Sequence, residues 1–392
     1  MTIHLRPDWF VEIETGDISD LDGWLDFVAK RDAHQPPPLL SRTEYEALPR
    51  PDRMAYDMAR RIANNNLPKH ETPMTDQARN QIQAVLNSNL YRMDPGVRSG
   101  IFVSADGNLG KSTLMREIAA DYDADIRAFR DMFPNSIKTR DRWVPVMWVT
   151  VPPKLSIRSL GLAILRFYGE HVPKGANDSH ITSRVEAVIR DCGTRLAVLD
   201  DITRYKDGEA DRFAADWIRN LMETSVSIVA MGVDIRGSGI LFDGRGRPRN
   251  QRLSTQTARR FTVIELDTFA YDTSENIRDW IAHLKAVEED LLLIDKQPGM
   301  LSTNLAEFLY ERTNGVIGVL TDYVQMAATS VIGRTPTNGG EFLNRADFDA
   351  IPLKSNDTEA LAPEPATTRR PARPRGKGRN SMYDQEKKTG AA

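Results

Sequence analysis

One short stretch constrains the fold of this chain more than any other. The apolar run Gly100–Ser104 precedes a glycine-containing loop, Ala105–Gly110, and an amphipathic segment that begins at Lys111. A strand, a tight loop and a helix in this order are typical of a phosphate-binding loop, because backbone N–H groups and the helix N-terminus converge on one point. The stretch therefore predicts a nucleotide-triphosphate site in an α/β fold.

The residue types in this loop suit the groups of ATP. Lys111 is expected to reach the β- and γ-phosphates, and the Ser112 hydroxyl is expected to hold Mg²⁺. Ala105 stands where the usual pattern has its first glycine, and Gly107 is expected to supply some of the lost backbone freedom. An ordinary strand–turn–helix is the alternative. The predicted contact segment is Ala105, Asp106, Gly107, Asn108, Leu109, Gly110, Lys111, Ser112 and Thr113.

A second motif supports the first. The apolar segment Arg195–Asp201 ends in two acidic residues, and ligands bind at the carboxyl ends of strands in open α/β sheets. Asp200 is expected to hold Mg²⁺, through water, and Asp201 to orient or deprotonate the attacking water. Many such ATPases have glutamate at the second position, so the shorter Asp201 predicts slow hydrolysis.

The order of apolar patterns divides the chain into four parts. Strands alternate with helices between residues 75 and 269, which predicts a parallel sheet. Residues 270–353 have helical periodicity only and predict a small lid. Residues 1–74 read as a partly helical extension, and residues 354–392 as a disordered basic tail. The predicted strands are 100–104, 144–151, 195–201, 226–233 and 262–267, and the first helix of the sheet region is expected to begin at Thr75 or Asp76.

Charge is unevenly distributed. The net charge is −3, but from Ala366 onward there are eight basic and two acidic residues, which leaves −9 for the rest. Seven arginines and one aspartate between Arg236 and Arg260 give that segment +6. It is read either as a phosphate-contacting loop or as a solvated loop with one functional arginine. A single cysteine excludes an intrachain disulfide, and no run is apolar enough to cross a membrane, so a cytoplasmic protein is expected.

Five segments occur in an order that resembles the AAA+ ATPases, and more narrowly the TniB/TnsC group of transposition regulators. They are Ala105–Ser112, Leu199–Ile202, Ala230–Val233, Arg259–Phe261 and Thr313–Leu320. The resemblance implies a P-loop AAA+ three-layer parallel sheet followed by a helical lid. It also implies an ATP- and Mg²⁺-dependent protein that oligomerises on double-stranded DNA, as a ring or a filament, and recruits or activates a DDE transposase.

The same resemblance gives roles to single residues. Arg260 matches an arginine that reaches the γ-phosphate of the neighbouring subunit, and Arg259 is the competing candidate. Many AAA+ proteins also carry a sensor arginine on the lid, but the corresponding segment here, Gly315–Gly318, has none. Asp234 is a weak candidate for the polar sensor residue after its strand.

Three other functions fit part of these patterns. One is another DNA-directed AAA+ loader, such as a replication initiator. Another is a nucleotide-binding adaptor that barely hydrolyses, which Ala105, the short Asp201 and the missing lid arginine favour. A small-molecule P-loop kinase is the third, and the helical lid and the Arg-Arg-Phe segment argue against it.

Overall fold

A single parallel sheet forms the centre of the computed structural model, which describes residues 9, 17–31, 33–94, 96–133, 142–153, 156–202, 218, 221–222, 224–236 and 259–352. Its strand order is β2-β3-β4-β1-β5, and every neighbouring pair is parallel. The strands are β1 (Gly100–Ser104), β2 (Val146–Thr150), β3 (Leu196–Asp200), β4 (Ser227–Gly232) and β5 (Phe261–Glu265). The five predicted strands are confirmed, and the bounds of β1 are those expected.

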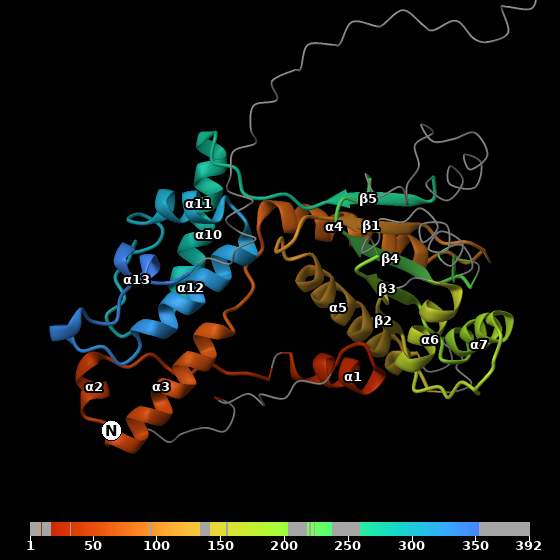
Figure 1. Ribbon diagram of the computed structural model, residues 1–392, viewed down its shortest axis with the longest axis horizontal. Helices are drawn as coiled ribbons and strands as arrows, with labels where there is room; N and C mark the ends of the chain where they lie inside the picture. Colours follow the sequence, from red (N-terminus) through yellow and green to blue (C-terminus); the bar gives the residue numbers. More distant parts are fainter. Residues whose placement is uncertain are drawn as a thin grey trace, which may run out of the picture.

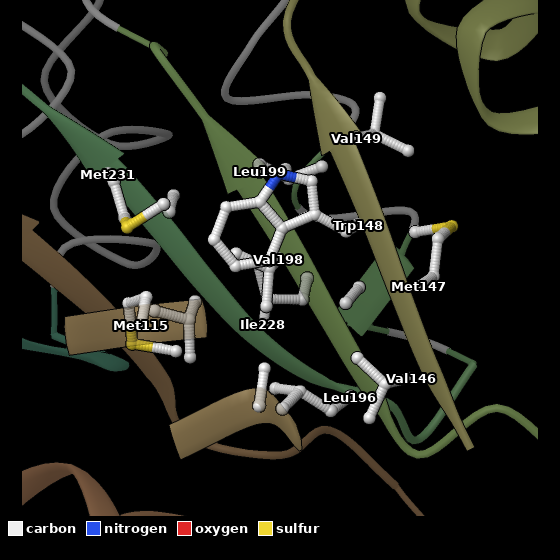
Figure 2. Close-up of a cluster of buried hydrophobic side chains, with 14 of the residues drawn as sticks. Met115, Val146, Met147, Trp148, Val149, Leu196, Val198, Leu199, Ile228 and Met231 are labelled. Carbon is white, nitrogen blue, oxygen red and sulfur yellow. The ribbon is translucent and has the colours of Figure 1, made fainter. Parts of the chain in front are cut away.

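Strands β1 to β4 are buried along almost their whole length, which suits a parallel sheet that is covered on both faces, whereas the edge strand β5 is only partly buried. Trp148 of β2 is 1% exposed and lies over the neighbouring strand β3, beside Val198 and Leu199 (Figure 2). Met115 and Met231 close the same cluster from the helix after β1 and from β4 (Figure 2). Because β1 and β3 lie on either side of β4, this core holds their carboxyl ends at the same edge of the sheet, one strand apart.

Three helices pack against strands of the sheet, and a fourth packs mainly against the third of them. They are α4 (Pro73–Leu90), α5 (Lys111–Met132), α6 (Ile157–Phe167) and α7 (Asp178–Asp191). The expected start of α4 at Thr75 or Asp76 is wrong: Thr72 is the N-cap and its hydroxyl accepts from the Thr75 N–H at 3.2 Å. Pro73 then occupies the first helical position, where its missing N–H is harmless.

A second hydrophobic cluster lies in the helical part of the chain. Its elements are α10 (Ser274–Asp290), α11 (Ala306–Thr313), α12 (Ile317–Val331), the short 3₁₀ turn η2 (Pro336–Asn338) and α13 (Arg345–Asp349). Thr273 caps α10, and Asn314 ends α11 in the left-handed conformation with φ 50°. The helical periodicity predicted after residue 270 is therefore confirmed. We refer to these elements as the lid.

The N-terminal helices contact both clusters. In α1 (Leu21–Lys30), the fully buried Trp24 stacks on Trp148 and donates its indole N–H to Asp123 at 3.2 Å. The helices α2 (Arg42–Glu46) and α3 (Arg50–Asn65) lie instead beside the lid, with α3 along α12 (Figure 1). The chain thus passes from the sheet to the lid, back to the sheet at α4, and again to the lid.

Within the described part of the chain, no helix is long and apolar enough to cross a membrane. Most of the arginine-rich segment, residues 237–258, and the basic tail lie outside the described residues.

Candidate nucleotide-binding site

The loop after β1 has the backbone of an anion site. Asn108 and Gly110 both have left-handed backbones, with φ 62° and 76°. Gly110 is the N-cap of α5 and supplies no side-chain cap, so the first N–H groups of that helix have no side-chain partner. Such a helix terminus favours negative charge and can bind a phosphate group.

The loop shows why alanine is tolerated at its first position. The Ala105 backbone does not have a positive φ, and its N–H donates to the Gly232 carbonyl of β4 at 3.2 Å. The expectation that Gly107 compensates for the missing glycine is wrong, because Gly107 also lacks a positive φ. Asn108 has the left-handed turn instead, which asparagine adopts more readily than most residues.

Three of the predicted residues meet at the carboxyl edge of the sheet. The Lys111 ammonium reaches back across the loop and donates to the Ala105 carbonyl at 3.2 Å. The Ser112 hydroxyl donates to the Asp200 carboxylate at 3.4 Å, although 88 residues separate them in the chain. A hydroxyl and a carboxylate are oxygen ligands of the kind that Mg²⁺ prefers, so these two residues fit the predicted metal.

Two acidic residues, Asp200 and Asp201, lie at the carboxyl end of β3. Burial raises the pKa of Asp200, and the neighbouring charge of Asp201 raises it further, while the hydrogen bond from Ser112 lowers it in part. Asp201 itself has φ 66° and turns the chain sharply away from the strand. Backbone bonds hold this turn, because the Ile202 N–H donates to the Met231 carbonyl at 2.8 Å. A cation between these residues would relieve the repulsion.

The raised pKa of Asp200 predicts a stability effect. Because the folded state holds a proton on Asp200 more tightly than the unfolded state does, the ionised carboxylate destabilises the fold at neutral pH. We expect Asp200→Asn to raise the melting temperature of the nucleotide-free protein at pH 7–8, by on the order of 2 °C. The gain should vanish as the pH falls toward the unfolded value of about 3.9.

Thermal unfolding across that pH range checks this expectation, with the exposed Asp131→Asn as the matched control. A lower melting temperature for Asp200→Asn at pH 7–8 would contradict it.

The two arginines stand apart from this cluster. Arg259 and Arg260 are exposed, and the Arg260 carbonyl accepts from the Gly100 N–H at 2.9 Å, at the amino end of β1. The phosphate loop follows the carboxyl end of the same strand, so the two features lie at opposite edges of the sheet. Arg236 pairs with Glu265, and the arginines between residues 237 and 258 lie outside the described residues.

A pocket lies beside the loop and was not identified from the sequence. Leu109 of the loop lines it, together with residues from the start of α4, from the segment after β5 and from the lid. Those residues are Thr72, Met74, Thr75, Leu266, Asp267, Phe269, Gly315 and Ile317. They come from separate segments, and no spacing within any one segment indicates that they share a pocket, so only the fold brings them together.

Comparisons with known proteins agree with this geometry. The model of the TniB family, described as bacterial TniB protein, matches residues 69–271. A comparison with curated protein sequences found no significant match. The Aeropyrum pernix ORC1 protein, solved in complex with DNA, has a TM-score of 0.50 and 15% identity, over 77% of this chain and 69% of its own. The Aeropyrum pernix ORC2 protein, solved in ADPNP-ADP complexes, has a TM-score of 0.50 and 14% identity, over 76% and 74%.

These likenesses confirm the predicted fold: the chain has an α/β fold with a five-stranded parallel sheet and is structurally similar to the AAA+ P-loop ATPases. The family match covers more than half of the chain and contains the phosphate loop, the Asp200–Asp201 pair and the Arg259–Arg260 pair. The chain belongs to the bacterial TniB protein family.

Proposed function

We propose that this protein is an ATP-dependent regulator of DNA transposition, which assembles on duplex DNA and engages a DDE transposase. One observation carries the nucleotide part of this proposal: the Ser112–Asp200 contact beside an uncapped helix N-terminus. Membership of the TniB family supports the transposition part. We infer that residues 75–269 form the nucleotide-binding domain, that 270–353 form its lid, and that 1–74 and 354–392 flank them.

The proposed site combines groups of two subunits. Residues 105–113 surround the phosphates, with Lys111 neutralising charge on the β- and γ-phosphates. Ser112 and Asp200 hold Mg²⁺, which when bound supplies further positive charge to the phosphate oxygens. Asp201 orients or deprotonates water, and Arg260 of a neighbouring copy contacts the γ-phosphate. The site is therefore complete only in an oligomer.

The pocket beside the loop gives the nucleobase a place. Its lining is mostly apolar at Leu109, Phe269 and Ile317, and polar at the Thr72 and Thr75 side of α4. Flat aromatic ligands bury most of their surface in apolar pockets with a few polar groups. We propose that the adenine ring enters here, because the pocket adjoins the phosphate loop through Leu109; the pocket would have to widen to admit the ring.

Measuring nucleotide binding by the isolated protein tests the proposed ATP site. We expect Lys111→Ala to weaken the binding of ATP with Mg²⁺ by roughly 10- to 100-fold, because it removes a charge-assisted contact to phosphate. Calorimetry measures the affinity, and the exposed Lys285→Ala on α10 is the control that keeps the loop intact. Equal affinities for the two variants would contradict the assignment of Lys111.

Electron microscopy with duplex DNA tests the proposed assembly of the protein on DNA. We expect rings or filaments with a nonhydrolysable ATP analogue and their loss with ADP.

An ATPase assay with and without DNA separates the proposal from an adaptor, which would bind ATP and show no turnover in either condition. Recruitment of a DDE transposase is then measured by adding the transposase to the assembled complex.

A further inference from the structure

The lid contacts the phosphate loop through its main chain. Gly318, the second residue of α12, donates its N–H to the Asn108 carbonyl at 2.8 Å. Two residues further along the loop, a Cβ built at Gly110 would lie 3.8 Å from the Ile317 side chain. Two successive lid residues thus touch the two left-handed positions of the loop, Asn108 and Gly110.

Only glycine permits this approach at position 318. A Cβ built there would lie 2.4 Å from the Asn108 carbonyl oxygen and 3.2 Å from the Asn108 carbonyl carbon. Gly318 lies inside a helix and does not have a positive φ, so its backbone conformation does not require glycine. The close contact with the loop is the reason that remains for glycine at this position.

The segment before Gly318 is held from the other side. The Phe269 N–H donates to the Gly315 carbonyl at 3.0 Å, and a Cβ at Gly315 would lie 2.2 Å from the Phe269 carbonyl oxygen. Phe269 lies shortly after β5. Leu266, the first residue after that strand, donates its N–H to the Ser104 carbonyl at 3.0 Å, at the end of β1. Residues 315–318 are therefore fixed between the loop and the chain segment that leaves the sheet.

We propose that Gly318 is a positioning residue that couples the lid to the nucleotide through the Asn108 carbonyl, in place of a side-chain sensor on the lid. No arginine lies between Gly315 and Gly318, and a first-turn N–H has no partner within its own helix. A backbone change at Asn108 that accompanies phosphate binding would strengthen this bond. Coupling is reciprocal, so a docked lid also favours the bound nucleotide. This inference rests on the proposed binding of a nucleotide by the loop.

Gly318→Ala tests the proposal, because its methyl group must push α12 away from Asn108. We expect the affinity for a nonhydrolysable ATP analogue with Mg²⁺ to fall at least about fivefold. Met326→Ala, on the same helix and partly exposed, is the control and should bind as the unaltered protein does. Calorimetry measures both, and far-UV circular dichroism verifies that each variant is folded.

Hydrogen exchange of the Gly318 amide in the unaltered protein gives a second readout that a merely structural glycine would not move. We expect the analogue to change its exchange rate severalfold, with no change in α13. An unchanged rate at saturating analogue, or an unchanged affinity of Gly318→Ala, would overturn the proposal while nucleotide binding stood. If the unaltered protein bound no nucleotide, the proposed function would fail and this inference with it. If Gly318→Ala did not fold, exchange in the unaltered protein decides alone.

Discussion

An Arg260→Ala variant is expected to bind ATP as the unaltered protein does, but to hydrolyse it about 10³-fold more slowly. The reason is that negative charge builds on the γ-phosphoryl oxygens as the bond to the leaving group breaks. A guanidinium placed against those oxygens stabilises this charge, and it contributes little to the binding of the ground state. Steady-state turnover in the presence of duplex DNA, together with calorimetric ATP affinity, measures the two effects separately.

The fold indicates that Arg260 acts on another copy of the chain. Phe261 pairs with Gly100 in the sheet, so Arg260 stands at the amino end of β1. The phosphate loop begins after Ser104, and five strand residues span roughly 16 Å. An exposed side chain at that edge is separated from its own loop by the length of the strand, so we propose that it serves a neighbouring copy.

Mixing two inactive variants distinguishes the subunits. Lys111→Ala retains Arg260, and Arg260→Ala retains the loop, so mixed interfaces contain one complete site and should regain part of the activity. Arg259→Ala is the matched control, since it removes an adjacent exposed arginine. If Arg259→Ala lost turnover and Arg260→Ala did not, the two roles would be exchanged. If the mixture stayed inactive, the proposal of a site shared between subunits would be wrong.

The strands could be predicted from the sequence because the local pattern determines them. Buried parallel strands are apolar on both faces, and β1 is such a run between a polar segment and a glycine-rich loop. The end of α5 could not be predicted in this way. The sequence pattern places the end of this helix near Asp121, but the helix continues to Met132 through a charged segment. In that segment the fully buried Asp123 accepts from Trp24 and pairs with Arg127. Its partner Trp24 lies 99 residues away.

The candidate site could be predicted only where its residues belong to local sequence motifs. Lys111, Ser112 and Asp200 belong to motifs that follow strands, and the parallel sheet brings their ends to one edge. The pocket and the Gly318–Asn108 bond join residues from different segments, and no local pattern predicts that these segments meet. Asn108, not Gly107, has the left-handed backbone conformation. Both residue types tolerate that conformation, so the spacing of the motif could not predict which of them adopts it.

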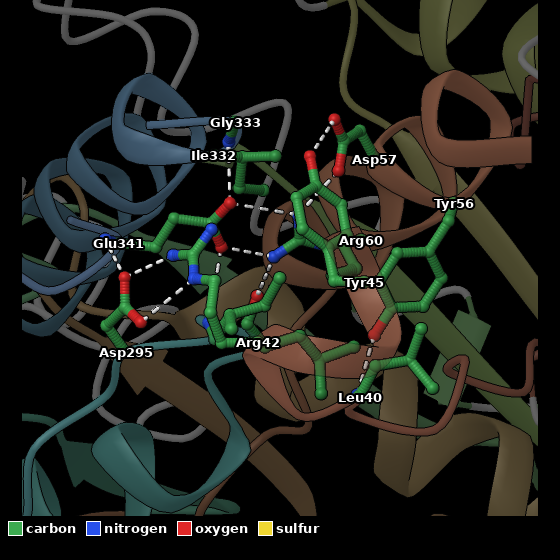
Figure 3. A network of polar contacts seen from close by, with 12 residues as sticks. Leu40, Arg42, Tyr45, Tyr56, Asp57, Arg60, Asp295, Ile332, Gly333 and Glu341 are labelled. Atoms are coloured by element: carbon green, nitrogen blue, oxygen red, sulfur yellow. Dashed lines mark hydrogen bonds and ion pairs between the residues drawn. The ribbon is translucent and has the colours of Figure 1, made fainter. Parts of the chain in front are cut away.

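A buried ion-pair network, which we call the α3–lid network, fixes the N-terminal helices on the lid (Figure 3). Arg60 of α3 and Glu341 are both fully buried, and the guanidinium donates to the carboxylate at 2.5 and 3.2 Å. Glu341 also accepts from the Ile294 and Gly333 N–H groups, at 3.2 and 2.7 Å. Burial lowers the pKa of Arg60, but the bonds and charge of Glu341 outweigh it and raise that pKa overall.

Glu341→Ala is therefore expected to destabilise the docking of α3 on the lid by about 3–5 kcal/mol, because it leaves the Arg60 charge buried without its main partner. Hydrogen exchange locates the effect: amides of α3 and α12 should exchange much faster, while those of β1 stay protected. The sheet serves as an internal reference, since its core is a separate hydrophobic cluster.

Two further variants show whether charge burial is the cause. Arg42→Ala removes a partly exposed pair with Asp295, and pairs of that kind are worth up to about 1 kcal/mol, so its effect should be far smaller. Arg60→Met combined with Glu341→Leu removes both buried charges and should recover most of the lost stability. If the double variant were as unstable as Glu341→Ala, the lost backbone bonds to Ile294 and Gly333 would be the cause instead. If α3 in Glu341→Ala exchanged as slowly as in the unaltered protein, apolar packing and the other polar contacts of α3, such as Asn65 with Thr329, would suffice to hold it on the lid.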